Sequence, residues 1–290
     1  MLLKKYLHLK GGSMEWNKKV AVITGAGGVL LSAYAKELAS KGVKTAVLSR
    51  NLKNAQCTAE EITSTGGIAK AYACDVLDKE NLIKTEEQIY KDFGQYHILI
   101  NGAGGNMPNA NTTNEIFNPK DLNNPNVCSF FDLDSKEIEK VFSLNFMGTF
   151  LVSQIFTKRM LGTKGAVIIN FSSMAAQSPM TKVLGYAAAK AAIDNFTKWL
   201  AVHFAEQGLR VNAVAPGFFL TNQNKSLLTN TDGSLTSRSH KIITHTPMRR
   251  FGEARDLFGA LSWLCDEEAS GFVTGSIIAV DGGFQAYSGV

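Results

Sequence analysis

Short apolar runs rich in β-branched residues alternate along the chain with longer stretches of helical periodicity. The runs cover residues 20–23, 44–48, 69–73, 97–100, 166–169, 210–214 and 276–280. The helical stretches cover about residues 28–41, 52–64, 79–93, 135–163, 184–206 and 253–266. Runs that are apolar throughout indicate strands buried on both faces, as in a parallel sheet covered by helices. The pattern predicts an α/β fold: a single doubly wound, Rossmann-like domain of about seven parallel strands with helices on both faces.

Two polar segments interrupt this alternation. Residues 106–133 are rich in Asn and Pro, and residues 221–250 follow the sixth predicted strand. Long irregular connections in a compact domain are usually functional lids or disordered. Because both segments follow carboxyl ends of strands, where ligands bind in such sheets, we expect a lid-like insertion and a substrate loop. No repeat or linker divides the sequence, which indicates one domain over 19–290 after an N-terminal extension, 1–18.

Composition excludes several classes of protein. The 290 residues are 45% hydrophobic and 19% charged, close to globular averages, which argues against disorder, collagen and coiled coil. No run approaches the roughly 18 apolar residues of a membrane-spanning helix, and the basic start lacks the apolar core of a secretory signal. The net charge of +5 is spread along the chain, so we expect no nucleic-acid partner, whereas an anionic small ligand is compatible.

The four cysteines point to the compartment. Cys57, Cys74, Cys128 and Cys265 are widely spaced and form no metal-binding pattern with each other or with histidines. We therefore expect reduced thiols in a cytoplasmic protein and no bound metal.

A glycine-rich turn, Thr24-Gly-Ala-Gly-Gly28, lies between the first predicted strand and helix. Glycines let the backbone approach a pyrophosphate closely, and the helix N-terminus offers N–H groups and partial positive charge. A turn without a ligand is the alternative, but the position inside a βαβ unit favours a dinucleotide.

The end of the second predicted strand bears on the choice of dinucleotide. It carries Ser49 and Arg50 where NAD-binding folds usually place an acid for the ribose 2′-hydroxyl. A guanidinium binds a 2′-phosphate in a fork, so NADP(H) is favoured over NAD(H), with a solvated surface Arg50 as the alternative. Asp75, at the end of the third strand, is placed to meet the adenine, or else caps the next helix.

The candidate chemistry lies near the middle of the chain. Tyr186 and Lys190 are four residues apart early in a predicted helix, so both side chains lie on one face. An adjacent ammonium lowers the pKa of a phenol and enables it to exchange protons near neutrality. Ser173 ends the fifth predicted strand, where its hydroxyl can stabilise charge on a substrate carbonyl oxygen.

Together these motifs resemble the short-chain dehydrogenase/reductase family, from about Val20 to the end of the chain. The resemblance also rests on Asn101-Gly-Ala-Gly104, Asn145 and Pro216-Gly217 with Thr221, and on the thirteen residues from Ser173 to Tyr186. It implies that Tyr186 exchanges the proton, Ser173 orients the substrate oxygen, and Lys190 lowers the pKa of Tyr186 and holds the nicotinamide ribose.

The resemblance also implies that Asn145 holds a water linking Lys190 to solvent. The cofactor-binding residues that we expect, in addition to Tyr186 and Lys190, are Gly25, Gly28, Val29, Leu30, Ser49, Arg50, Asn51, Asp75, Val76, Asn101, Ala103, Gly104, Pro216, Gly217 and Thr221.

One departure concerns the first turn. Val29 and Leu31 stand where the family usually has its second and third glycines, and we expect Leu31 to crowd the helix against the sheet. Gly27 and Gly28 are placed to supply the close approach from shifted positions.

The segments 101–106, 130–134, 215–224, 245–248 and 280–290 resemble a branch labelled D-mannonate oxidoreductase, or fructuronate reductase, which acts on sugar acids. An anionic, hydroxylated substrate suits the amides and cations after Thr221, namely Asn222, Gln223, Asn224, Lys225, Arg238, His240 and His245. An ordinary solvated lid is the alternative.

Other functions stay open at this point. The substrate could be a 3-oxoacyl thioester or a simple sugar, as in gluconate 5-dehydrogenases, and a non-catalytic dinucleotide-binding sensor is a further alternative. Hydrolase chemistry is disfavoured because no Gly-x-Ser-x-Gly elbow follows a predicted strand.

The helix over 184–206 is apolar on more than one face, including Phe196, Trp199 and Phe204. A second apolar face needs another helix or a second subunit. The family resemblance implies a homo-oligomer, a dimer or tetramer, built on this helix, and an intrachain neighbour is the competing account. Segment 106–133 could likewise cover the substrate mouth or form a subunit contact.

Overall fold

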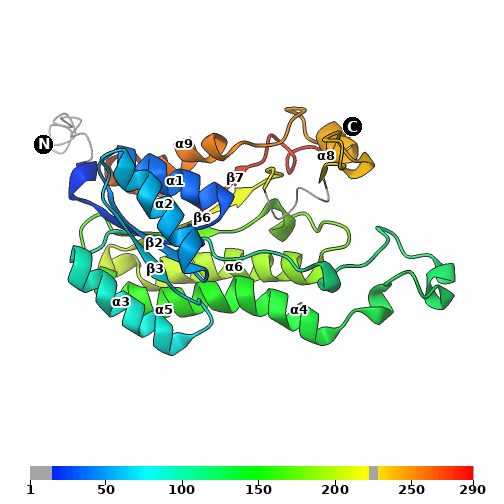
Figure 1. The fold of residues 1–290 in the computed structure, drawn as a ribbon, viewed down its shortest axis with the longest axis horizontal. Coiled ribbons are helices and arrows are strands. Elements are labelled where there is room, and N and C mark those ends of the chain that lie inside the picture. Colours follow the sequence, from blue (N-terminus) through cyan, green and yellow to red (C-terminus); the bar gives the residue numbers. More distant parts are fainter. Residues whose placement is uncertain (1–14, 222–227, 290) are drawn as a thin grey trace, which may run out of the picture.

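The computed structural model describes residues 15–221 and 228–289. Within them, seven parallel strands form one sheet in the order β3-β2-β1-β4-β5-β6-β7 (Figure 1). The strands are β1 (Val20–Thr24), β2 (Lys44–Ser49), β3 (Ala69–Ala73), β4 (Ile98–Asn101), β5 (Val167–Phe171), β6 (Arg210–Pro216) and β7 (Ile277–Val280). The order reverses between β1 and β4, which opens a crevice beyond their carboxyl ends. The doubly wound sheet expected from the sequence is confirmed.

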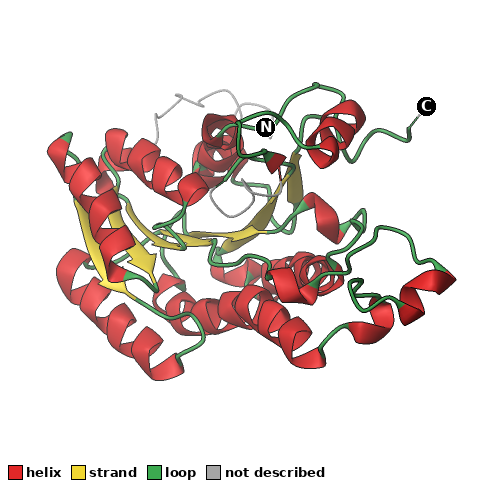
Figure 2. Ribbon diagram, turned by 45° about the vertical axis from the view of Figure 1, so that its right-hand side comes forward, coloured by secondary structure: helices red, strands yellow, loops and turns green. Residues whose placement is uncertain are grey.

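Helices cover both faces of the sheet (Figures 1 and 2). On one face lie α1 (Val29–Ser40), α2 (Leu52–Ser64) and α9 (Phe258–Cys265), and on the other α3 (Lys79–Phe93), α5 (Gly148–Met160) and α6 (Leu184–His203). Successive strand residues point to opposite faces, so Ala21 and Ile23 join one core and Val20 and Val22 the other. The strands β1, β4, β5 and β6 are buried throughout and β2 is buried except at its two ends, whereas the edge strands β3 and β7 are only partly buried.

The long helix expected over 135–163 differs from the prediction in its middle. It begins as α4 (Ser135–Phe142), passes through a π-helical turn (Ser143–Met147) and continues as α5. The side-chain amide of Asn145 donates to the Val141 carbonyl oxygen at 2.8 Å. This bond occupies a carbonyl that the helix backbone would otherwise use, which accounts for the widened turn. The helix expected over 253–266 likewise starts with a 3-10 turn, Ala254–Leu257, before α9, and α10 (Glu267–Ser270) follows.

The two polar segments lie against each other. Segment 106–133 contains 3-10 turns and projects from the body at the right of Figure 1, where α8 (Ser237–His245) of segment 221–250 lies above it. The Glu115 carboxylate accepts from Arg238 Nη1 at 3.3 Å and forms a second ion pair with Lys241. This contact joins segment 106–133 to α8. Asn222, Gln223, Asn224 and Lys225 lie outside the described residues.

Candidate functional site

The turn between β1 and α1 brings the chain close to the end of β4. Gly25 has φ +71°, and a Cβ there would lie 2.7 Å from the Gly102 carbonyl oxygen. Gly28 precedes the first residue of α1 in extended conformation, and both Gly28 and Val29 are exposed. The first N–H groups of α1 therefore begin at the crevice between β1 and β4, which suits a phosphate.

Leu31 does not crowd α1 away from the sheet, and that expectation was wrong. Its side chain is 3% exposed and fills the space in front of Gly102, where a Cβ would lie 1.8 Å from Leu31 Cδ1. The missing side chain of Gly102 makes the room. The leucine and the glycine thus form a complementary pair, and α1 packs closely despite the departure from the family's glycine pattern.

Three predicted catalytic side chains converge where β5 meets α6. Tyr186 and Lys190 lie on α6, and Ser173 follows β5 directly. The Ser173 hydroxyl lies close enough to the Tyr186 phenol to lower its pKa. Lys190 Nζ donates to the Phe171 carbonyl oxygen at 2.8 Å and lies 5.5 Å from the centroid of the Tyr186 ring. Two structural elements that are separate in sequence therefore place a phenol, a hydroxyl and an ammonium together.

Burial has the largest influence on the pKa values of Lys190 and Tyr186. It lowers the pKa of Lys190 to about 8, with the Asp194 carboxylate acting in the opposite direction. It also raises the pKa of Tyr186, against the opposing influence of Ser173. This net direction is opposite to the one expected from the ammonium alone, because desolvation of the phenolate outweighs other influences in this arrangement.

Asn145 is completely buried beside the same cluster, so an exposed polar position is excluded. Its side chain accepts from the Gly105 N–H at 3.2 Å and donates to the Gly105 carbonyl oxygen at 2.7 Å. A Cβ on Gly104 would lie 2.6 Å from Asn145 Oδ1 and 3.4 Å from Lys190 Nζ. Both polar groups therefore approach the backbone of Gly104 closely, and any side chain at this position would collide with Asn145.

Comparisons with known proteins agree with this geometry. The profile of the short chain dehydrogenase family matches residues 19–232. The chain belongs to this family. It is 57% identical over 272 residues to a Bacillus subtilis oxidoreductase called UxuB and described as uncharacterized, covering 94% of this chain and 96% of that protein. It is 31% identical over 271 residues to the Escherichia coli 7α-hydroxysteroid dehydrogenase, covering 93% and 96% respectively.

A solved structure from Haemophilus influenzae is also similar. That protein, provisionally named a D-mannonate oxidoreductase, holds bound NAD. It is 53% identical to this chain and superposes with a TM-score of 0.90, covering 94% of this chain and 97% of its own. The resemblance inferred from the motifs is therefore confirmed. The family membership establishes that the protein is an NAD(P)-dependent short-chain dehydrogenase that acts on CH–OH groups.

The remaining expected cofactor contacts of this short-chain dehydrogenase surround the crevice. Ser49 lies against Gly27, where a Cβ would come within 2.8 Å of Ser49 Oγ, and Arg50 is exposed. The Asn51 side chain caps α2 by accepting from the Lys53 N–H at 3.0 Å. Leu30 is half-buried against the core of the α1 face.

Asp75 and Val76 follow β3. Asp75 Oδ1 accepts from the Leu77 N–H at 3.0 Å, and Asp78, not Asp75, caps α3, so the alternative of a helix cap at Asp75 is wrong. Val76 is buried, with its side chain filling the space at Gly148, where a Cβ would lie 2.7 Å from it.

The side chain of Asn101 faces the interior instead of the crevice. Its Nδ2 donates at 2.9 Å to both Ser153 Oγ and Asn170 Oδ1, which joins β4 to α5 and β5. Its expected role in lining the cofactor is thus limited to the backbone, whereas Ala103 and Gly104 are half-buried at the crevice. Pro216 is buried at the end of β6, and Gly217 and Thr221 are half-buried beyond it.

Two residues at the site were missed from the sequence. Thr24 Oγ1 accepts from the backbone N–H groups of Gly102 and Ala103 at 3.1 and 3.2 Å, and so fixes the loop after β4. Ser172 donates through its hydroxyl to the buried carboxylate of Asp194 on α6. Each is a polar residue at the carboxyl end of an apolar strand, and this position in the sequence could have identified both as site residues.

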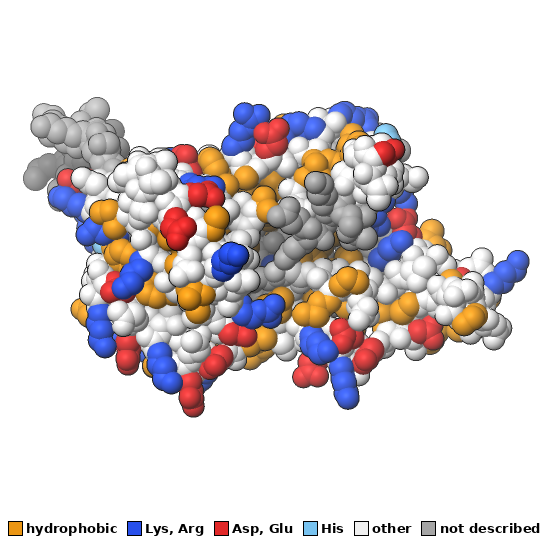
Figure 3. All heavy atoms as spheres, viewed as in Figure 1, with side chains coloured by type: hydrophobic (Ala, Val, Ile, Leu, Met, Phe, Trp, Pro, Cys, Tyr) orange, Lys and Arg blue, Asp and Glu red, His pale blue; other side chains and the backbone are white. Residues whose placement is uncertain are grey.

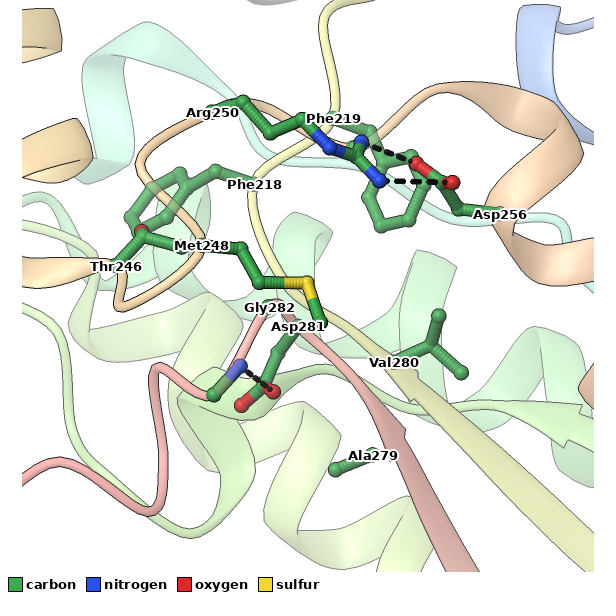
Figure 4. Close-up of a pocket in the computed structure, with 12 residues that line it drawn as sticks. Phe218, Phe219, Thr246, Met248, Arg250, Asp256, Ala279, Val280, Asp281 and Gly282 are labelled. Carbon is green, nitrogen blue, oxygen red and sulfur yellow. Dashed lines mark hydrogen bonds and ion pairs between the residues drawn. The ribbon is translucent and has the colours of Figure 1, made fainter.

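A cavity of about 360 Å³ opens beyond the ends of β6 and β7 (Figure 4). Phe218, Phe219, Met248 and Val280 contribute to its wall. Arg250 and Asp256 brace it through two hydrogen bonds of 2.6 and 3.0 Å. Tyr186, Lys190 and Ser173 do not occur among the described residues that line it, so the cavity is separate from the polar cluster.

Other features bear on possible partners. In residues 15–221 and 228–289 we find no group of three His, Cys, Asp or Glu side chains that could hold a metal. No helix in that part of the chain has the length and apolar character needed to cross a membrane. Basic and acidic side chains are intermixed on the face drawn in Figure 3. All four cysteines are free thiols.

Proposed function

We propose that this short-chain dehydrogenase interconverts a ketone and a secondary alcohol in a sugar acid, of the D-mannonate/D-fructuronate type. The observation that carries the proposal is the convergence of Tyr186, Ser173 and Lys190 beside the crevice. When bound, the nicotinamide cofactor accepts or supplies the hydride.

The side chains divide the remaining work. The Tyr186 hydroxyl donates a proton to the carbonyl oxygen during reduction, and its phenolate takes a proton from the alcohol during oxidation. The Ser173 hydroxyl donates a hydrogen bond to the same oxygen and stabilises its negative charge. The Lys190 ammonium favours the phenolate electrostatically and is placed to donate to the ribose hydroxyls. Asn145 is proposed to hold a water that links Lys190 to solvent, since Asn145 Oδ1 and Lys190 Nζ both lie close to Gly104.

The crevice fits a dinucleotide. Gly25, Gly28 and the exposed first turn of α1 accommodate the pyrophosphate, and the backbone of Gly104 lies close to Lys190. We propose NADP(H) as the preferred form because exposed Arg50 follows β2 and no acid stands at that strand end. The NAD bound by the Haemophilus influenzae relative makes NAD(H) the competing choice.

An anionic substrate is supported by the charges at the mouth. Arg238, Lys241 and Lys182 all act on one carboxylate, that of Glu115, and Lys182 lies four residues before Tyr186. Three cations acting on one anion leave an excess of positive charge where segment 106–133 meets α8, and such an excess attracts a carboxylate. The provisional name of the 53% identical relative points to the same substrate class.

We also propose a homo-oligomer in the cytoplasm. Trp199 and Val202 on α6 are 56% and 80% exposed. A second subunit that packs on this helix would remove these apolar side chains from water. An intrachain neighbour covers other parts of this helix, since Phe196 stacks edge-on against Phe146.

The test is a panel of substrates assayed with both NADPH and NADH. We expect fructuronate to be reduced and mannonate to be oxidised with a higher kcat/KM than gluconate-type sugars or 3-oxoacyl thioesters. A clear preference for a thioester or a neutral sugar would replace the proposed substrate while keeping the reaction class.

A further inference from the structure

The helix that carries Tyr186 and Lys190 also carries a buried carboxylate. Asp194 follows Lys190 by four residues and Tyr186 by eight, so the three side chains lie along one face of α6. Asp194 is 8% exposed. A buried carboxylate is strongly unfavourable unless hydrogen bonds or opposite charges compensate it, so its position requires an explanation.

The partners of Asp194 come from the segment that carries Ser173. The Ser172 hydroxyl donates to Asp194 Oδ1, and the Gln177 side chain lies close enough to lower the pKa of the carboxylate. Ser172 precedes the turn in which the Ser173 hydroxyl accepts from the Ala175 N–H at 3.1 Å. The carboxylate thereby ties the residue before Ser173 to the helix of Tyr186.

The charges around Asp194 are few. Lys190 and Lys198, both on α6, are the charged groups that act on its carboxylate in the described residues, while the end of β5 and the turn after it contribute the neutral Ser172 and Gln177. Burial raises the pKa of Asp194, and its hydrogen bonds and the two lysines oppose that rise. Conversely, Asp194 opposes the lowering of the pKa of Lys190 by burial.

We propose that Asp194 is a positioning residue for the reaction: it holds the Ser173 segment against α6 through Ser172 and places its carboxylate one helical turn from Lys190. The inference rests on the roles proposed for Tyr186 and Lys190, but it does not depend on the identity of the substrate.

The test compares Asp194→Asn, Asp194→Glu and Ser172→Ala in the full-length protein. The pH dependence of kcat/KM is measured with whichever substrate the wild-type protein turns over fastest. Loss of the carboxylate charge makes Lys190 lose its proton at lower pH, so Asp194→Asn should move the alkaline limb of the profile down by about one pH unit. That shift corresponds to about a tenfold loss of kcat/KM on the limb.

The other variants separate charge from position. Ser172→Ala and Asp194→Glu keep the charge but disturb the hydrogen bond, so kcat should fall while the alkaline limb stays in place. Glu139→Gln, at an exposed position on α4, removes the same charge at a distance and should leave the profile unchanged. If Asp194→Asn does not fold, Ser172→Ala and Asp194→Glu still test the positioning role of Asp194. In both variants kcat should fall while the alkaline limb of the pH profile stays in place.

Two results would overturn the inference. One is an Asp194→Asn profile that superimposes on the wild-type profile, and the other is an equal limb shift in Ser172→Ala. These outcomes are distinct from failure of the proposed function, which would show as undiminished turnover in Tyr186→Phe.

Discussion

The complementary pair formed by Leu31 and Gly102 makes a sharp prediction about packing at the cofactor crevice. A methyl group added in Gly102→Ala would lie 1.8 Å from Leu31 Cδ1 and 3.2 Å from the Thr24 carbonyl oxygen. Leu31 is 3% exposed and has little freedom to move away. Overpacking of this kind typically costs about 1–3 kcal/mol, so we expect Gly102→Ala to lower the free energy of unfolding by that amount.

Leu31→Ala alone should destabilise for the opposite reason. It leaves a cavity against Gly102, and buried Leu→Ala changes cost about 2–5 kcal/mol. In the double variant, the methyl group introduced by Gly102→Ala occupies part of that cavity without a clash. The combined cost should therefore be smaller than the sum of the single costs, by about 1–3 kcal/mol.

Urea unfolding followed by circular dichroism measures all four proteins of this cycle. Gly259→Ala is the matched control, because nothing lies within 4 Å of a Cβ there and α9 continues through it. It should gain about 0.5–1 kcal/mol from helix propensity. If the costs of the two single variants sum to the cost of the double variant within about 0.5 kcal/mol, Leu31 and Gly102 do not share packing, because independent residues behave additively. That result would refute the prediction.

Two further predictions concern charge. Lys190→Met should raise the free energy of unfolding at neutral pH by up to about 3 kcal/mol, because the buried ammonium has a pKa of about 8 against an ordinary 10.5. The unfolded state binds the proton more tightly, so this gain in stability should shrink as pH rises from about 8 to about 10.5. Urea unfolding measured at these two pH values tests the trend, and an equal gain at both would contradict it. Arg50→Asp should shift the ratio of kcat/KM values from NADPH towards NADH, and an unchanged ratio would show that Arg50 does not select the cofactor.

The fold was predictable from the sequence because its signals are local. Apolar runs such as residues 166–169 identify buried parallel strands, and the spacing of Tyr186 and Lys190 places both side chains on one helix face. The edge strand β3 also has the bounds expected from the sequence, residues 69–73, although it is only partly buried.

What the sequence could not provide depends on contacts between distant segments. The room for Leu31 comes from Gly102, seventy-one residues later, and the π-helical turn comes from a side chain competing for a backbone carbonyl. The junction of Glu115 with α8 joins two segments with no periodicity of their own. Asp194 resembles an ordinary polar helix residue in the sequence, and only its burial and its bond to Ser172 distinguish it.

The central claim is that the Tyr186 hydroxyl moves the proton that accompanies hydride transfer. Its most direct test is Tyr186→Phe, with reduced nicotinamide oxidation followed by absorbance and the dissociation constant of the cofactor measured on the same protein. We expect kcat to fall by a factor of about 10²–10⁴ while the cofactor affinity is retained. Turnover at the wild-type rate with the cofactor bound would contradict it.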